Sequence, residues 1–260
     1  MRWNRRWWQE QSPWRHRALG TGACLSLVAL AAAGARLAAR PVLSGVSFSQ
    51  ELVDRQGRLL RLTLSADDKY RLRTRLDDID PRYVEAVLLL EDRHFFAHPG
   101  VNPVALVRAA ASLVGGGARV GASTLTMQLA RVRYGLQTRT LGGKVRQIAA
   151  ALWLELTHSK RELLEAYVNL VPFGANVEGI GAASRIYFGR AARKLALGEL
   201  LSLAVIPQSP AARRLSEGGL VTGVSLVRAR ERLATRWIER HPGDAKHVGG
   251  GLKLPLAAQR

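Results

Sequence analysis

The chain reads E-D-R-H-F-F-A-H-P-G from residue 91 to residue 100, at the end of a predicted helix that begins at Pro81. One face of that helix carries an apolar stripe formed by Val84, Val87 and Leu88. Glu91 continues the stripe, and burial of a carboxyl group raises its pKa, which suits a general base or acid near neutral pH. The alternative is a structural glutamate that meets water at the end of the stripe or pairs with Arg93.

The other polar groups of this stretch stand beside two phenylalanines, and hydrophobic packing gives no reason for them. His98 directly precedes the Pro-Gly pair that ends the helix. A lone histidine is more often a structural hydrogen-bonding residue than a catalyst, so we expect His98 to cap or brace the loop that presents Glu91. Asp92 and Arg93 are assigned a structural role near the same site.

A second polar stretch reads G-A-S-T-L-T-M-Q-L-A-R from residue 121 to residue 131. Its leucines are one helical turn apart, which predicts a helix that starts near Ser123 and Thr124. Backbone N–H groups and hydroxyls at a helix start can bind a phosphate or a sugar, and Gln128 adds an amide. Ser and Thr are also ordinary helix caps, so this stretch alone is a weak indication of a site.

Positive charge is concentrated between Arg119 and Arg161, where eight Lys and Arg accompany the single acid Glu155. A basic run is usually a solvated face, but this one follows directly on the hydroxyl-rich helix start. Lys144 and Gln147 share one face of the next predicted helix, and cations beside a hydroxyl-lined cap suit a pyrophosphate. The core-facing stripe of that helix is expected to consist of Val145, Ile148, Leu152 and Leu156.

Composition narrows the class of protein and of partner. The 260 residues carry 39 Lys and Arg against 20 Asp and Glu, and this net charge of +19 favours nucleic acid, an anionic membrane or a phosphate-bearing substrate. An apolar content of 47% argues against a disordered chain. The single cysteine, Cys24, excludes an intrachain disulfide and a Cys-rich metal site.

The first 36 residues have the pattern of a membrane segment. Residues 1–17 form a basic N-terminus, and residues 18–35 are uncharged and would reach about 27 Å as a helix, enough to cross a hydrocarbon core. The arginines before this span predict a cytoplasmic N-terminus with the bulk of the chain outside. A cleavable signal peptide is the rival interpretation, because the end of the span is rich in alanine.

The rest of the chain divides into three parts. Residues 46–73 contain two short apolar runs around a turn and predict a small β-hairpin. Residues 74–240 are expected to be almost entirely helical and to end in an amphipathic helix, and residues 241–260 to be a flexible tail. Glu178, inside the helical part, fits either an ion pair that holds the fold or a residue of the cleft.

Together these stretches resemble the peptidoglycan glycosyltransferase domain of glycosyltransferase family 51, and the G-G-K-V-R-Q form most resembles its penicillin-binding protein 1C branch. Two of the matching blocks are the polar stretches at residues 91–100 and 121–131. The others are G-K-V-R-Q at 143–147, S-K-R-E-L-L-E-A-Y-V-N-L-V-P-F-G at 159–174, E-G-I-G-A-A-S-R-I-Y-F-G-R at 178–190 and L-A-V-I-P-Q-S-P at 203–210.

The resemblance implies a mainly α, lysozyme-like domain with a small membrane-proximal subdomain, in the periplasm and anchored to the inner membrane. It implies polymerisation of lipid II into the nascent glycan chain, with Glu91 as the base, and cell-wall synthase proteins as further partners. The positions that contact donor phosphates correspond to Arg131, Arg139 and Lys144. The positions that line the cleft correspond to Ser123, Thr124 and Gln128.

One position departs from the family pattern. The third block usually carries a glutamate, assigned to leaving-group assistance or to a divalent metal, where this chain has Gln147. An amide cannot transfer a proton at neutral pH and is a weaker metal ligand than a carboxylate. We therefore expect at most a weak dependence on Mg²⁺ or Mn²⁺ and assign no metal ligand. No S-x-x-K sequence follows Pro210, so we expect a monofunctional enzyme.

Three other functions are alternatives to the transferase. A lysozyme-like hydrolase could use one acidic glutamate, but it would not need cations for a pyrophosphate. A non-enzymatic scaffold that binds lipid II is consistent with Gln147. A nucleic-acid binder fits worst, because the cations lie beyond a predicted membrane span and no nucleic-acid motif is present.

Overall fold

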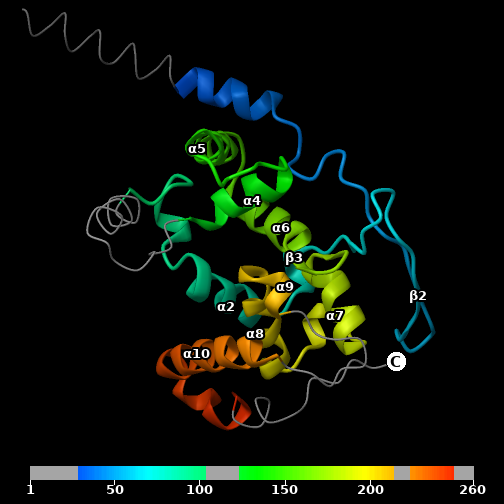
Figure 1. Ribbon diagram of the computed structural model, residues 1–260. Helices are drawn as coiled ribbons and strands as arrows, with labels where there is room; N and C mark the ends of the chain where they lie inside the picture. The colour runs from blue at the N-terminus through cyan, green and yellow to red at the C-terminus, as the bar shows by residue number, and fades with distance from the viewer. Residues whose placement is uncertain (1–28, 104–122, 214–222, 249–260) are drawn as a thin grey trace, which may run out of the picture.

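The computed structural model describes residues 29–103, 123–213 and 223–248, which are mainly helical (Figure 1). The predicted N-terminus at 1–17 and most of the predicted span at 18–35 lie outside these ranges. Residues 29–38 form a helix. Over the described ranges, no helix combines the length and the apolar character that a membrane crossing requires.

A short hairpin precedes the helical part of the chain, as predicted. Strand β1 (Glu51–Val53) pairs antiparallel with β2 (Leu59–Leu62). The Arg71 side chain, which follows the hairpin, is buried and donates to a carboxylate oxygen of Glu178 at 2.5 Å. Glu178 is therefore part of an ion pair that holds this segment on the helical domain. Of the two roles expected for Glu178, an ion pair or a residue of the cleft, the structure supports the ion pair.

The remaining elements form the helical domain. Its α-helices are α2 (Pro81–Glu91), α4 (Leu125–Arg133), α5 (Leu141–Thr157), α6 (Lys160–Leu170), α7 (Ile180–Phe188), α8 (Leu197–Val205), α9 (Pro210–Arg213) and α10 (Val224–Arg240). A second hairpin joins α6 to α7 through β3 (Pro172–Gly174) and β4 (Val177–Glu178). The 3₁₀ turns are η2 (Leu76–Asp78), η3 (Phe95–Ala97), η4 (Ala192–Lys194), η5 (Ile206–Gln208) and η6 (Pro242–Asp244).

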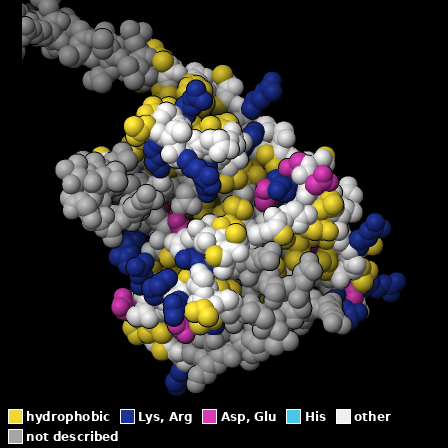
Figure 2. Space-filling view, in the orientation of Figure 1, with side chains coloured by type: hydrophobic (Ala, Val, Ile, Leu, Met, Phe, Trp, Pro, Cys, Tyr) yellow, Lys and Arg dark blue, Asp and Glu magenta, His cyan; other side chains and the backbone are white. Residues whose placement is uncertain are grey.

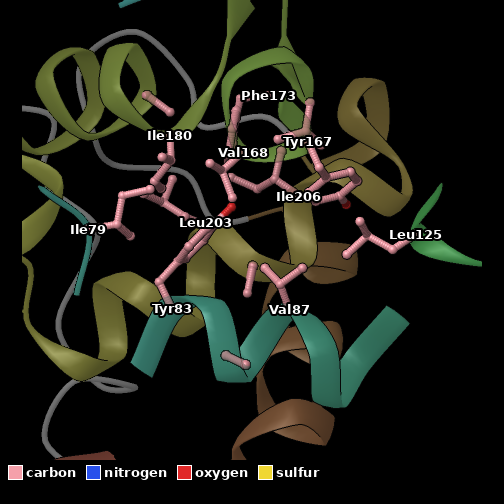
Figure 3. Close-up of a cluster of buried hydrophobic side chains, with 14 of the residues drawn as sticks. Ile79, Tyr83, Val87, Leu125, Tyr167, Val168, Phe173, Ile180, Leu203 and Ile206 are labelled. Atoms are coloured by element: carbon pink, nitrogen blue, oxygen red, sulfur yellow. The ribbon is translucent and has the colours of Figure 1, made fainter. Parts of the chain in front are cut away.

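Helix α2 begins where the sequence predicts it, because the Asp80 side chain accepts a hydrogen bond from the backbone N–H of Arg82 and Pro81 follows the cap. Its buried face packs on α8. Figure 3 shows Tyr83 and Val87 of α2 pointing into the same apolar cluster as residues of α6, α8 and η5. This core holds the C-terminal end of α2 against the centre of the domain.

Helix α10 is amphipathic as predicted, and its apolar face closes the far side of the core. It packs on α8 and α2. The indole N–H of Trp237 donates to Asp244 at 2.8 Å, and Val248 is fully buried. The prediction of a flexible tail from residue 241 is therefore wrong for residues 241–248, and the rest of that tail lies outside the described residues.

Helix α4 lies between α5 and α6 (Figure 1). The face that α5 turns to the interior consists of Gln147, Ala151, Leu154 and Thr157. The predicted core stripe is wrong, because Val145 is 64% exposed, Leu152 45% and Leu156 42%, with Ile148 only partly buried. Helical periodicity identifies an apolar face but not what covers it, and among the described residues no protein surface covers this one.

Candidate active site

Glu91 is the last residue of α2, and its carboxyl group reaches the start of α4. Gln128 of α4 donates its amide N–H to Glu91 Oε2 at 2.6 Å. Glu91 Oε1 is also buried but has no hydrogen-bond partner among the described residues. A buried acceptor without a partner is uncommon in native proteins.

Burial raises the pKa of Glu91 above its ordinary value. The amides of Gln128 and Gln208 and the positive charge of Arg213 oppose this rise, and the neighbouring charge of Asp92 adds to it. The carboxyl group is thus held closer to neutrality than an exposed glutamate while keeping partners that stabilise its ionised form. Such a balance is what a general base at neutral pH requires.

Asp92 braces the loop that follows Glu91. Its carboxylate accepts a hydrogen bond from the backbone N–H of Leu125 at 3.0 Å and lies 2.9 Å from Nε2 of His98. Both Asp92 and His98 are buried. The pair therefore ties the end of α2 to the start of α4, and His98 has the bracing position expected for it. Arg93 is exposed.

The cap of α4 is formed by Thr124. Its hydroxyl accepts from the backbone N–H of Met127 and donates to the carbonyl of Gly100. Because Thr124 is buried and used in this way, it supports the site from behind rather than lining it.

Lys144 and Gln147 face α4 from the first turns of α5. The Lys144 ammonium donates to Ser123 Oγ at 2.8 Å and to Gln147 Oε1 at 2.9 Å. Burial lowers the pKa of Lys144, and the positive charge of Arg131 lowers it further. Two cations held this close are stabilised when a multiply charged anion binds between them.

Glu91 and the side chains from α4 and α5 that face it line a pocket of about 300 Å³. Its wall contains Glu91, Ser123, Gln128, Arg131, Lys144 and Gln147, so six of the predicted site residues come together. Arg139 is exposed and does not line it. Figure 2 shows more Lys and Arg than Asp and Glu side chains on the face of the molecule in view.

Three lining residues were not predicted as site residues: Thr138, Pro207 and Gln208. Pro207 and Gln208 lie in η5, inside the family-matching block at 203–210, so that block was the sequence signal that could have identified them as lining residues. Arg213 of α9, which donates to Gln208 Oε1 at 2.7 Å, lies beyond that block and had no signal in the sequence.

A divalent metal does not fit the position of Gln147. The amide oxygen already accepts from the Lys144 ammonium, which would repel a cation there. Glu91 is the sole carboxylate in the described wall of the pocket, and no cluster of three His, Cys, Asp or Glu suited to a metal occurs among the described residues. No step is assigned to a metal.

The chain belongs to the transglycosylase family, whose pattern it matches over residues 56–233. It is 44% identical over 170 residues to penicillin-binding protein 1C of Escherichia coli (strain K12), across 65% of this chain and 22% of that protein. It is 40% identical over 144 residues to penicillin-binding protein 1A of the same strain, across 55% of this chain and 17% of that protein.

The crystal structure of penicillin-binding protein 1A from Haemophilus influenzae aligns with a TM-score of 0.45 and 17% identity, covering 82% of this chain and 21% of that chain. This chain spans about a fifth of the length of the curated relatives quoted above. The family membership makes it a transglycosylase domain homologous to the glycosyltransferase part of penicillin-binding proteins.

Proposed function

We propose that this chain polymerises lipid II into glycan strands, with inversion at the anomeric carbon and release of undecaprenyl pyrophosphate. The observation that supports this most directly is the pairing, in one pocket, of a buried carboxyl group with two cations, Glu91 with Arg131 and Lys144. A hydrolase of the same fold would use the carboxyl group but would have no use for the cations.

In this reaction Glu91 accepts the proton of the acceptor's 4-hydroxyl through its unpartnered Oε1. The acceptor oxygen forms a bond to the donor's anomeric carbon from the side opposite the pyrophosphate. The bond from that carbon to the phosphate oxygen breaks, and its electron pair leaves with undecaprenyl pyrophosphate. Gln128 holds the carboxylate in place while the proton moves.

The departing pyrophosphate gains negative charge, and fixed cations stabilise that charge without proton transfer. Arg131 and Lys144 supply them from the pocket wall. Arg139 is exposed next to the lining residue Thr138, and we propose that it meets the phosphates at the margin of the pocket. Ser123 and Gln128 line the cleft, and Thr124 supports them.

The exposed apolar stripe of α5 supports contact with the membrane that carries the lipid substrate. It comprises Leu141, Val145, Leu152, Trp153 and Leu156. Figure 2 shows hydrophobic side chains around this helix at the top of the view. An exposed apolar patch of this kind indicates an interaction surface. We propose that the stripe rests on the outer leaflet of the inner membrane, with the single-pass anchor at residues 18–35 beside it.

The experiment is polymerisation of fluorescent lipid II by the full-length chain in detergent. Wild type is expected to form polymer and release undecaprenyl pyrophosphate, and Glu91→Gln to lose at least about 100-fold in rate, the usual share of a general base. Glu239→Gln, the same change at an exposed position of α10, serves as the matched control and should retain activity.

The alternatives give different results. A wild-type chain that binds lipid II but forms no polymer under any condition would be a scaffold, and the proposal would fail. Cleavage of preformed glycan strands without polymerisation would identify a hydrolase. Equal activity of wild type and Glu91→Gln would show that Glu91 is not the general base.

A further inference from the structure

Gln147 is held by two hydrogen bonds in the interior, between α5 and α4. The side chain is 2% exposed. Its amide N–H donates to the backbone carbonyl of Met127 at 2.7 Å, and its amide oxygen accepts from the Lys144 ammonium at 2.9 Å. The ammonium also donates to Ser123 Oγ. A continuous chain of hydrogen bonds therefore runs from the backbone of α4 through Gln147 to Lys144 and back to the start of α4.

This chain of bonds requires an amide. The carbonyl of Met127 can only accept, and the ammonium can only donate, so the residue between them must do both. The requirement also fixes which amide atom faces which partner, because the flipped amide would set donor against donor and oxygen against oxygen. A glutamate would place a carboxylate oxygen against the Met127 carbonyl oxygen, which is a repulsive contact at this distance.

We propose that Gln147 is a positioning residue that holds Lys144 for the donor pyrophosphate, and that a neutral amide is the functional residue here rather than a weakened glutamate. This inference rests on the proposed function. The ammonium has three N–H bonds, of which Ser123 and Gln147 use two, so the third has no acceptor among the described residues and can donate to a phosphate oxygen.

The charge of the pocket leads to the same assignment. Among the described residues of the pocket wall, Glu91 of α2 is the acidic side chain, and Arg131 of α4 and Lys144 of α5 are the basic side chains. With an amide at position 147, the charge on Lys144 is not neutralised by an ion pair and remains available to the pyrophosphate. A carboxylate there would pair with Lys144 and compete with the substrate.

The test uses the full-length chain with Gln147→Glu and Gln147→Met, and farnesyl pyrophosphate as a water-soluble probe of the phosphate site. Each variant is expected to bind the probe roughly tenfold more weakly or worse, as expected from the loss of a hydrogen bond to a charged group. Gln56→Glu, the same change at an exposed position of the hairpin, is the control and should leave binding unchanged.

Two further readouts separate positioning from general damage. The alkaline limb of the activity profile should move to lower pH in Gln147→Met, because the ammonium loses an acceptor, and to higher pH in Gln147→Glu, because it gains an anion. In a Lys144→Met background neither change should weaken probe binding further. If Gln147→Met does not fold, Gln147→Asn keeps the amide, withdraws it by one methylene and should weaken probe binding in the same way.

The inference is overturned if Gln147→Glu matches or exceeds wild type, if the alkaline limb does not move, or if the effects persist without Lys144. Each of these results requires a wild-type chain that makes polymer. A wild type that makes none would instead defeat the proposed function, so the two failures are distinguishable.

Discussion

Gln128 donates a hydrogen bond to Oε2 of Glu91 at 2.6 Å, while Oε1 of the same carboxyl group is buried and has no partner in the part of the chain that the structure describes. One oxygen is thus anchored to α4, and the other has no described partner. The anchoring bond also stabilises the ionised form of a carboxyl group whose pKa burial has raised. The pH dependence of the enzyme is therefore expected to depend on residues around Glu91 as well as on Glu91 itself.

Gln128→Met removes this bond at nearly constant volume. The ionised carboxylate loses a donor, so the pKa of Glu91 rises further and the base is protonated over a wider acidic range. The acid limb of the activity profile should move to higher pH, with a rate about tenfold lower at its acid end. Steady-state rates across the pH range measure this, with Gln56→Met as the exposed control. An unmoved acid limb would contradict it.

Arg213→Gln should move the acid limb in the same direction for a different reason. The positive charge of Arg213 lowers the pKa of Glu91, so its removal raises that pKa. Salt screens charge interactions with a Debye length of about 10 Å at 0.1 M and screens buried charges less, so the shift should shrink in part as salt is added, unlike the shift in Gln128→Met. Arg236→Gln on the exposed face of α10 is the control. A shift that does not respond to salt would show that Arg213 acts through Gln208 rather than through its charge.

Asp92→Asn should destabilise the fold. The carboxylate accepts from the buried N–H of Leu125 and is paired with His98, and an asparagine has one acceptor atom in place of two. The expected loss in free energy of unfolding is about 1–3 kcal/mol, measured by thermal or urea unfolding. Asp78→Asn, at an exposed position of η2, should change it little. Equal stability of the two variants would show that Asp92 does not stabilise the loop after α2.

Val145→Ser combined with Leu152→Ser tests the apolar stripe of α5. Both side chains are exposed, so the fold should be retained, but each lost apolar contact with lipid is worth about 1.5–3 kcal/mol when fully buried. Polymerisation of lipid II in vesicles should fall at least about tenfold while polymerisation in detergent is kept. The matched pair Val53→Ser and Leu60→Ser changes the exposed hairpin instead. Equal losses in vesicles and in detergent would contradict membrane contact.

Much of the site could be predicted because its residues lie in short local patterns. Glu91 continues an apolar stripe on α2, and Ser123 and Gln128 surround a helix start. Arg213 could not be assigned in the same way, since it comes near Glu91 only through the fold, and for Gln208 the sequence offered only its matching block. Contacts between segments so distant in sequence carry no local periodicity.

In the stripe of α5, by contrast, a local pattern was present but its interpretation as core was wrong. The spacing of Val145, Leu152 and Leu156 correctly indicates an apolar helical face, and the interpretation as core was wrong because burial depends on what packs against that face. The interior side instead contains the polar Gln147, which is buried because both of its amide groups find partners.

The sequence by itself indicated the helical class of the domain, the family and the cap of α2, and it predicted the carboxyl group and two of the cations that line the pocket, because each depends on local spacing or on a motif. The tertiary structure alone decided which face of α5 is covered, which oxygen of Glu91 is free, and that Gln147 connects Met127 to Lys144. Those features depend on the packing of α2, α4 and α5 around one pocket, and packing is a property of the whole fold rather than of any single segment.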